Sequence, residues 1–387
     1  MRIFEYENKD TRQILALGPE SNGNFSFFYQ NKLYFSEDFG DLLIDKNFHN
    51  YKTGLSKFLS ANNFRPDIIL TDSHPLYKTT TLGRNLAKKY PARLIQIQHH
   101  LAHIFSAIGD KTLLTRNYQL EKALGITLDG TGYGSDDKIW GGEIFRISKS
   151  KFQILNQIPQ LKLQIERIGH LENQVMIGGD LAIKEPARML IGILSKFLPK
   201  ESIYPHIRKY YSAQEFEVLY NQSQQKFNCI ETSSTGRILD AVSVLLGFCG
   251  NQRNYKHEPI ELLEKNSAKP YLDLKPEISK DSDGNHILST TYLFNYILKY
   301  LHKNKDISDG DRNRLAATAQ LYIAQGLYRI ISDADFEIRD FYLAGGIANN
   351  KIISGYLDSK GAYASRTIPR GDAGLSFGQI VFYLSGH

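Results

Sequence analysis

The chain has 387 residues and a formal net charge of +6, and 42% of its residues are hydrophobic, which suits two lobes better than a single core. It contains no run of eighteen apolar residues and no apolar N-terminal segment, so we expect a cytoplasmic protein without a membrane span or signal peptide. Two cysteines exclude a disulfide framework, and the diffuse charge does not indicate a nucleic-acid partner.

The first predicted elements are three short strands separated by turns, at residues 13–17, 25–29 and 32–35. The same arrangement of strand, glycine-bearing loop and strand returns at residues 123–147. This weak repeat predicts an α/β protein in which two related lobes face a cleft. We assign residues 1–118 to the first lobe and residues 119–387 to the second.

A pair of histidines marks the next junction between a strand and a helix. The strand at residues 93–98 leads into a helix on which His99 and His103 project from one face. Two imidazoles so spaced can hold one metal ion, although such a pair can equally be solvated or cap the helix. Asp129 and Asp372, each beside glycines, would add two carboxylates. A mixed nitrogen and oxygen site with open positions is typical of a catalytic metal.

The second lobe is expected to carry an insertion. Residues from about 158 to 225 read as helical and charged, with a long helix at residues 181–197.

In the first lobe, the polar residues 71–75 come at the end of a predicted strand. The carboxyl ends of strands are where open α/β sheets bind ligands.

Two later motifs suit a ligand that carries phosphate or sugar. Residues 232–241 place a Ser/Thr-Gly-Arg sequence at the start of a helix, where backbone amides favour anions. The predicted strand at residues 340–344 ends in Gly345 and Gly346, which allow the backbone to approach a ligand closely. Asn349 or its neighbour would then bond a sugar or a base. The glycine pair can also be a simple tight turn.

In their order along the chain, these motifs resemble the C-terminal part of the HypF family of carbamoyltransferases, which act in NiFe-hydrogenase maturation. That part is similar to TsaD, the tRNA threonylcarbamoyl transferase, and the resemblance runs from about Leu15 to the C-terminus. The motifs that carry it lie at residues 98–103, 129–134 with 139–143, 167–171, 178–180 with 185–189, 232–241, 345–346, and 372 with 378–379.

The resemblance implies an actin-like ATPase fold of two RNase H-like lobes. It implies one divalent metal, which is Fe, Zn or Mg, on His99, His103, Asp129 and Asp372, with the first three as catalytic residues. It also implies that the ATP or AMP moiety of a carbamoyl adenylate binds two sets of residues. The phosphate would contact Asp129, Gly130, Thr131, Gly132 and Tyr133, and the adenosine would contact Gly236, Arg237, Asp240, Gly345, Gly346 and Asn349.

In the family, a separate domain makes carbamoyl adenylate, and this part passes the carbamoyl group to the C-terminal cysteine of HypE. Nothing here matches the adenylate-forming domain, so we expect a separate adenylate-forming protein or domain and a HypE-like acceptor. The turn at residues 20–24 also lacks the usual lysine, and residues 318–320 lack a histidine common in the family. These departures leave two alternatives open: transfer of carbamoyl or threonylcarbamoyl to tRNA or a small molecule, and a non-catalytic nucleotide and metal-binding scaffold.

Overall fold

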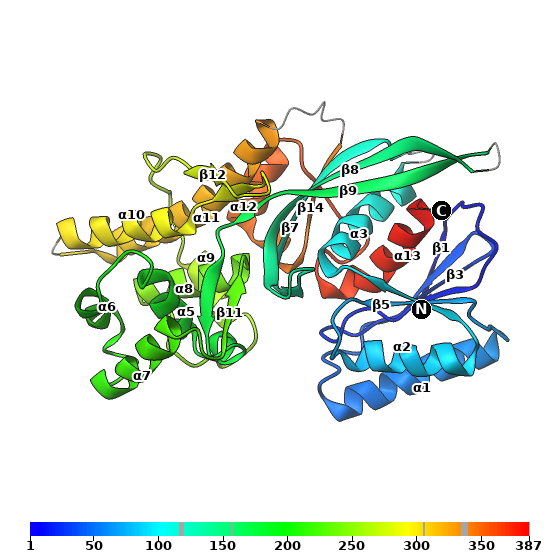
Figure 1. Cartoon of the computed structure of the whole chain (residues 1–387), viewed down its shortest axis with the longest axis horizontal. Coiled ribbons are helices and arrows are strands. Elements are labelled where there is room, and N and C mark those ends of the chain that lie inside the picture. Colours follow the sequence, from blue (N-terminus) through cyan, green and yellow to red (C-terminus); the bar gives the residue numbers. More distant parts are fainter. Residues whose placement is uncertain (116–119, 156–157, 305, 334–339, 387) are drawn as a thin grey trace.

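The computed structural model describes residues 1–115, 120–155, 158–304, 306–333 and 340–386. In these ranges the chain forms two mixed β-sheets, with helices on their faces (Figure 1). No helix in the described ranges combines the length and the apolar character that a membrane crossing requires.

The first sheet contains four antiparallel strands followed by two strands that run parallel to the last of them. Its order is β1-β4-β3-β2-β5-β6, in which β2 pairs antiparallel with β3 and parallel with β5. Its strands are β1 (Arg2–Glu5), β2 (Ile14–Ala16), β3 (Ser26–Tyr29), β4 (Lys32–Phe35), β5 (Ile68–Asp72) and β6 (Arg93–Ile97). The sheet has an apolar face on each side, because Leu15 and Ile69 pack toward α1 (Asp45–Ala61) and α2 (Lys78–Lys89), whereas Ile14 and Leu70 face the opposite side.

The second sheet repeats this order. Its central strands are β9 (Ile158–Leu171), β8 (Ile139–Leu155), β7 (Lys122–Tyr133), β14 (Asp340–Ala344) and β15 (Tyr363–Ala364). The first three are antiparallel, and β14 and β15 run parallel to β7. The order β9-β8-β7-β14-β15 in this sheet thus corresponds to the order β4-β3-β2-β5-β6 in the first sheet. In both, three antiparallel strands are followed by two parallel ones. The predicted actin-like fold of two RNase H-like lobes is therefore confirmed. The predicted limits, 1–118 and 119–387, stay a prediction.

Two helices lie between the sheets and join them (Figure 1). The helix α3 (His99–Leu114) packs on β7 and β14, and α13 (Leu375–Ser385) packs on β2, β3 and β5. The two helices also pack on each other at very short range, since a Cβ added to Gly378 would lie 1.8 Å from the carbonyl oxygen of Ala102. Glycine at this position lets α13 approach α3, and it fixes the segment just before α13 against the start of α3.

The expected helical insertion begins later than about residue 158. Residues 158–171 form β9 and residues 174–177 form β10 (Gln174–Ile177), and the first helix starts at Leu181. The prediction missed the alternation of Leu163 and Ile165 with polar neighbours, which is a strand pattern that β9 satisfies by pairing with β8. The long helix expected at 181–197 is split at Pro186, because proline cannot donate a backbone hydrogen bond within a helix.

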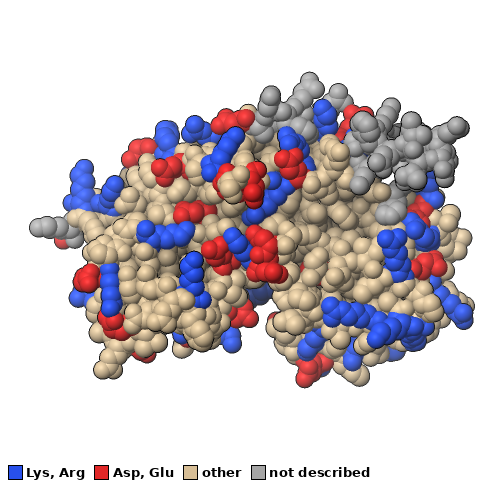
Figure 2. Space-filling view, in the orientation of Figure 1, with Lys and Arg blue, Asp and Glu red and all other residues tan. Residues whose placement is uncertain are grey.

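Helices of the second lobe pack on the face of its sheet that α3 and α13 do not cover, and two short strand pairs extend this sheet. The pairs are β10 with β11 (Cys229–Thr232) and β12 (Ile278–Lys280) with β13 (His286–Leu288). The helices are α4 (Leu181–Lys184), α5 (Pro186–Leu194), α6 (Lys200–Ile207), α7 (Ala213–Gln224), α8 (Thr235–Leu246), α9 (Glu258–Lys265), α10 (Thr290–Lys303), α11 (Asp309–Ser332) and α12 (Lys351–Ser359). Figure 2 shows the molecule hollowed between the part that carries α1 and α2 and the part that carries α5 to α9, with basic and acidic side chains interspersed on this face.

Candidate metal centre and ligand cavity

Four side chains that are far apart in the sequence meet between the two sheets. The nearest ligand atoms of His99, His103, Asp129 and Asp372 all lie within 4.8 Å of one another. The Nε2 atoms of His99 and His103 are 3.2 Å apart, and Asp129 Oδ2 is 3.1 Å from His99 Nε2. Asp372 Oδ1 is 3.4 Å from His103 Nε2. Two imidazole nitrogens and two carboxylate oxygens form a donor set that fits a divalent metal such as zinc or iron.

The fold brings each of these residues to the site for a local reason. The helix α3 begins at His99, because the Gln98 side chain accepts a hydrogen bond from Leu101 N and caps the helix. His99 and His103 are then one turn apart on the same face. Asp129 lies where the pairing of β7 with β8 shifts register between Leu128 and Gly132, and such a bulge re-aims side chains.

Asp372 opens the short 3-10 helix η2 (Asp372–Gly374), which directly precedes α13. Segments from both lobes hold this turn in place. Asn24 of the first lobe donates from Nδ2 to the carbonyl oxygen of Ala373 over 2.8 Å. On the other side, Gly345 N donates to the carbonyl oxygen of Arg370 over 3.0 Å. The Asp372 carboxylate is therefore fixed by contacts outside the cluster, as a preformed ligand must be.

A further carboxylate, Asp72, lies behind His99. Asp72 Oδ2 is 2.6 Å from His99 Nδ1, and both side chains are at most 1% exposed. A carboxylate in this position accepts the Nδ1 proton, so that the lone pair of Nε2 faces the cluster. Sequence reasoning gave Asp72 no role of its own, although it belongs to the polar residues that follow a buried strand. The structure shows why that position matters: β5 and β6 are parallel, so Asp72 and His99 meet at the same sheet edge.

The charges in the cluster depend on one another. Burial disfavours charged His99, but the charge of Asp72 and hydrogen bonds to Asp129 and Asp372 raise the pKa of His99 well above its usual value. Burial likewise opposes ionised Asp129 and Asp372, and hydrogen bonds to His103 and His99 still lower the pKa of both carboxyls. The carboxylates of the cluster thus stabilise positive charge on the histidines. A metal cation would supply this positive charge in place of the protons.

The third histidine of the motif is not part of this cluster. Burial, followed by the charge of His99, lowers the pKa of His100 to about 4, so His100 is neutral. Its Nδ1 pairs with Gln98 Nε2 at 2.9 Å, and its ring packs near Trp140. His100 therefore supports the junction of β6 with α3 and supplies no ligand.

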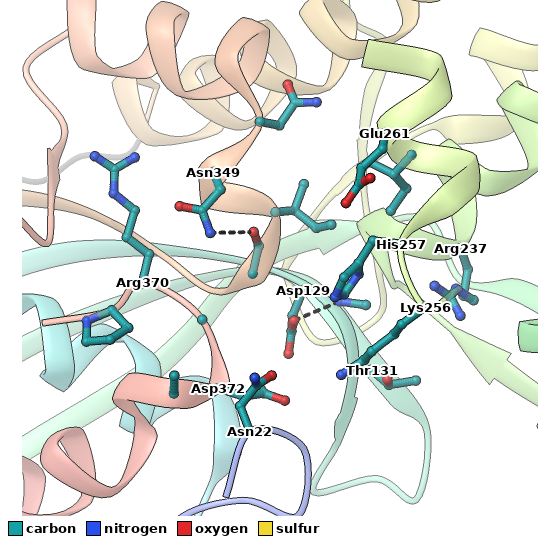
Figure 3. A pocket seen from close by; sticks show the side chains of 18 of the residues that line it. Asn22, Asp129, Thr131, Arg237, Lys256, His257, Glu261, Asn349, Arg370 and Asp372 are labelled. Atoms are coloured by element: carbon teal, nitrogen blue, oxygen red, sulfur yellow. Dashed lines mark hydrogen bonds between the residues drawn. The ribbon is translucent and has the colours of Figure 1, made fainter. Parts of the chain in front are cut away.

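A cavity of about 500 Å³ opens beside Asp129 and Asp372 (Figure 3). This volume is within the range of small-molecule sites. Several of the predicted ligand-binding residues line it, namely Asp129, Gly130, Thr131, Arg237, Gly346, Asn349 and Asp372. Other predicted residues are absent from its described wall, namely Gly132, Tyr133, Gly236, Asp240 and Gly345.

The three glycines outside the wall allow close packing behind it. A Cβ on Gly132 would lie 2.3 Å from His100 Cε1, and one on Gly236 would lie 2.8 Å from Gly130 Cα. Gly345 has a φ of +94° and passes the carbonyl oxygen of Leu128 so closely that a Cβ would lie 2.2 Å from it. These positions shape the loops that present Asp129 and Gly130, and their own contact with a ligand stays a prediction.

Asp240 is buried behind the cavity, where it holds two arginines. Its Oδ2 is 2.8 Å from Arg237 Nη2 and is also paired with Arg253, and both arginines line the cavity. The Ser234 hydroxyl caps α8 at Arg237 N and donates to the carbonyl oxygen of Gly130, which ties this helix to the Asp129 loop. Two guanidinium groups share one carboxylate here, so this side of the cavity carries net positive charge and favours an anionic ligand.

The cavity wall also contains apolar groups and an acidic one. Ile183, Ile260 and Ile347 supply an apolar wall that suits the face of a flat ring. Asn349 and Glu261 lie beside it and offer hydrogen-bonding groups (Figure 3). Sequence reasoning missed Glu261, as well as the cavity residues Arg253, Lys256 and His257, because they lie in or just after a loop without periodic pattern.

Comparison with known proteins gives consistent matches along the chain. A family model described as "Carbamoyltransferase, Kae1-like Domain, second subdomain" matches residues 125–379, and one described as "HypF Kae1-like domain" matches residues 9–110. The chain is 34% identical over 389 residues to a probable carbamoyltransferase HypF of Methanocaldococcus jannaschii, covering 97% of this chain and 47% of that protein.

Two solved structures have the same fold along nearly the whole chain. The crystal structure of T. kodakarensis HypF matches with a TM-score of 0.83 and 29% identity, covering 98% of this chain and 48% of that one. Full-length HypF in its phosphate- and nucleotide-bound form matches with a TM-score of 0.80 and 25% identity, covering 99% of this chain and 47% of that one. The chain thus spans about half the length of each of these three relatives.

Proposed function

The chain belongs to the HypF carbamoyltransferase family, and we propose that it transfers a carbamoyl group from a carbamoyl adenylate, bound in the cavity, to a thiol of an acceptor protein. The observation that carries this proposal is that the metal cluster and the cavity share two residues. Asp129 and Asp372 belong both to the two-histidine, two-aspartate cluster and to the wall of the nucleotide-sized cavity. A ligand in the cavity therefore reaches the cluster directly.

The distribution of polar and apolar groups along the cavity suggests how the adenylate is oriented in it. We place its adenine against the apolar wall, with the ribose near Glu261 and Asn349. The phosphate then points toward Gly130 and Thr131, next to the positively charged arginine pair. The nucleotide-bound form of a related HypF structure supports a nucleotide as the ligand class.

His99, His103, Asp129 and Asp372 would hold a divalent metal, and the exposed edge of the cluster faces the cavity. When bound, such an ion would stabilise negative charge on the phosphate as AMP leaves. Asp72 keeps the His99 ring in the tautomer and orientation that ligation requires, because its carboxylate accepts the Nδ1 proton.

In the proposed reaction, the acceptor sulfur attacks the carbamoyl carbon as a thiolate. A C–S bond forms, the C–O bond to the phosphate breaks, and AMP leaves with the bonding electron pair. The protein's own part is to hold the phosphate and the carbamoyl group in line with the incoming sulfur and to limit access of water.

The nucleophile is proposed to come from a partner, a HypE-like acceptor, for a reason visible in the chain. Neither Cys229 nor Cys249 lines the cavity, and burial raises the pKa of both thiols. A raised thiol pKa lowers the fraction of thiolate and therefore the reactivity. We also propose that a separate protein or domain supplies the carbamoyl adenylate.

The test is to mix the purified chain with carbamoyl adenylate and a HypE-like acceptor, and to follow the acceptor mass and AMP release. We expect the carbamoyl mass on the acceptor's terminal cysteine, and no gain when that cysteine is replaced by serine. His103→Ala, which removes one cluster nitrogen, is expected to abolish transfer. Transfer to tRNA in a parallel reaction, or release of AMP with no carbamoylated acceptor, would contradict the proposal.

A further inference from the structure

The loop between α8 and α9 reaches across the mouth of the cavity to the other lobe. The Lys256 ammonium donates a hydrogen bond to the hydroxyl of Ser21, which lies in the turn between β2 and β3 of the first lobe. The carbonyl oxygen of Lys256 accepts from Arg253 Nη1 over 2.7 Å, and Arg253 is itself paired with Asp240. The backbone that presents Lys256 is therefore anchored to the wall of the second lobe, whereas its side chain contacts the first.

Lys256, unlike Arg237 and Arg253, has no carboxylate partner among the described residues. Arg237 and Arg253 share the Asp240 carboxylate, and Arg370 donates to the carbonyl oxygens of Ser365 and Ala348. Within the described part of the chain, Lys256 forms no ion pair, and its acceptor is a neutral hydroxyl. An ammonium bonded only to a hydroxyl retains its charge for an anionic ligand.

The position of this ammonium matches the phosphate end of the cavity. In Figure 3 the Lys256 side chain extends across the cavity toward Asn22, which lies next to Ser21 in the first-lobe turn. Thr131 and Asp129 of the second lobe line the same cavity (Figure 3). The turn at residues 18–24 contains no lysine of its own, and within the described residues Lys256 is the side-chain cation that is hydrogen-bonded to it.

We propose that Lys256 and Ser21, one from each lobe, together bind the phosphate group of the nucleotide, and that Lys256 makes the site select a phosphorylated nucleoside over the nucleoside. A phosphate oxygen is a stronger acceptor for the ammonium than a hydroxyl. The Ser21 hydroxyl, which donates a long bond of 3.4 Å to Asn22 Oδ1, would turn its proton to the same phosphate. Binding of the phosphate would therefore draw on both lobes at once. This inference rests on the proposed function, because it takes the ligand to be an adenine nucleotide.

The test compares AMP with adenosine by titration calorimetry on the full chain. Lys256→Gln is expected to weaken AMP binding about tenfold, because a hydrogen bond to a charged group is lost, while adenosine affinity stays the same. Lys256→Arg should restore most of the preference for AMP, and Ser21→Ala should weaken AMP binding by about threefold. Lys88→Gln, on the exposed side of α2, serves as the matched control and should bind both ligands normally.

The outcomes separate this inference from the function on which it rests. If Lys256→Gln binds AMP as tightly as the unsubstituted chain does, or weakens AMP and adenosine equally, the phosphate contact is wrong and the nucleotide site remains. If the unsubstituted chain binds neither ligand, both the inference and the proposed nucleotide function are overturned. Circular dichroism melting of each variant checks that a loss of affinity does not reflect unfolding.

Discussion

Replacing Asp72 tests whether the carboxylate behind His99 tunes a metal site. The hydrogen bond between Asp72 Oδ2 and His99 Nδ1 is 2.6 Å long and completely buried, so solvent cannot replace it. Asp72→Asn retains a carbonyl oxygen that accepts the Nδ1 proton but removes the charge that makes the imidazole a better ligand. Asp72→Ala removes both. Partners of this kind change metal affinity by about 10- to 100-fold, or about 1.4 to 2.7 kcal/mol.

We therefore expect Asp72→Asn to lower the affinity for Zn²⁺ about tenfold and Asp72→Ala about 100-fold. The assay is competition with a chromophoric chelator at fixed pH, with the metal-free chain prepared by dialysis against EDTA. Asp67→Asn is the matched control, because Asp67 lies just before β5, at the opposite end from Asp72, and accepts a hydrogen bond from Gln13 N. This control is expected to bind zinc with unchanged affinity.

Two results would refute the reasoning in different ways. Unchanged affinity in both Asp72 variants, together with loss of binding in His103→Ala, would show that the ligands are correct and that Asp72 has no orienting role. Retention of about one metal per chain in His103→Ala would reject the metal assignment itself. A melting curve for each variant separates these results from loss of the fold.

Three further predictions follow from other parts of the site. Gly378→Ala places a Cβ 1.8 Å from the Ala102 carbonyl oxygen, so we expect about 1–3 kcal/mol of lost stability and weaker metal binding by the assays above. Gly355→Ala, on the exposed side of α12 with nothing within 4 Å, should instead gain up to about 1 kcal/mol of stability and leave metal binding unchanged. Asp240→Asn leaves two buried guanidinium groups without the charged partner that positions them, and melting should show about 3 kcal/mol of lost stability. Because the pKa of His99 is raised, protons compete with the metal, and competition assays at several pH values should show an affinity that rises with pH by up to about tenfold per unit below that pKa.

The metal cluster was largely predictable because each of its residues has a local signal. The spacing of His99 and His103 follows from the helical period, and Asp129 and Asp372 stand beside glycines. Asp72 had no such signal. Its role depends on which strand lies next to β6, and pairing between β5 and β6 is a tertiary fact that one sequence does not report.

The cavity was predicted only in part, for a different physical reason. Backbone motifs such as the glycine pair at Gly345 and Gly346 are visible in a sequence, but the cationic loop is not, since Arg253 and Lys256 lie between helices in a segment without period. For Asp240, the motif was visible in the sequence but the role of the side chain was not. Asp240 was predicted to contact the adenosine, but the sequence does not distinguish a residue that touches a ligand from one that is buried beneath the arginines next to it.

The arrangement of the site across the two lobes has a chemical consequence. Asp72, His99 and His103 belong to the β5-to-α3 segment beside the first sheet, whereas Asp129 belongs to the second sheet. An ion held by this cluster would therefore connect the two sheets at the same point where a bound phosphate would contact Lys256. An acyl adenylate is exposed to hydrolysis wherever water reaches its carbonyl carbon. A site completed by residues of both lobes holds such a ligand only while the lobes are together, so binding and protection from water depend on the same contacts.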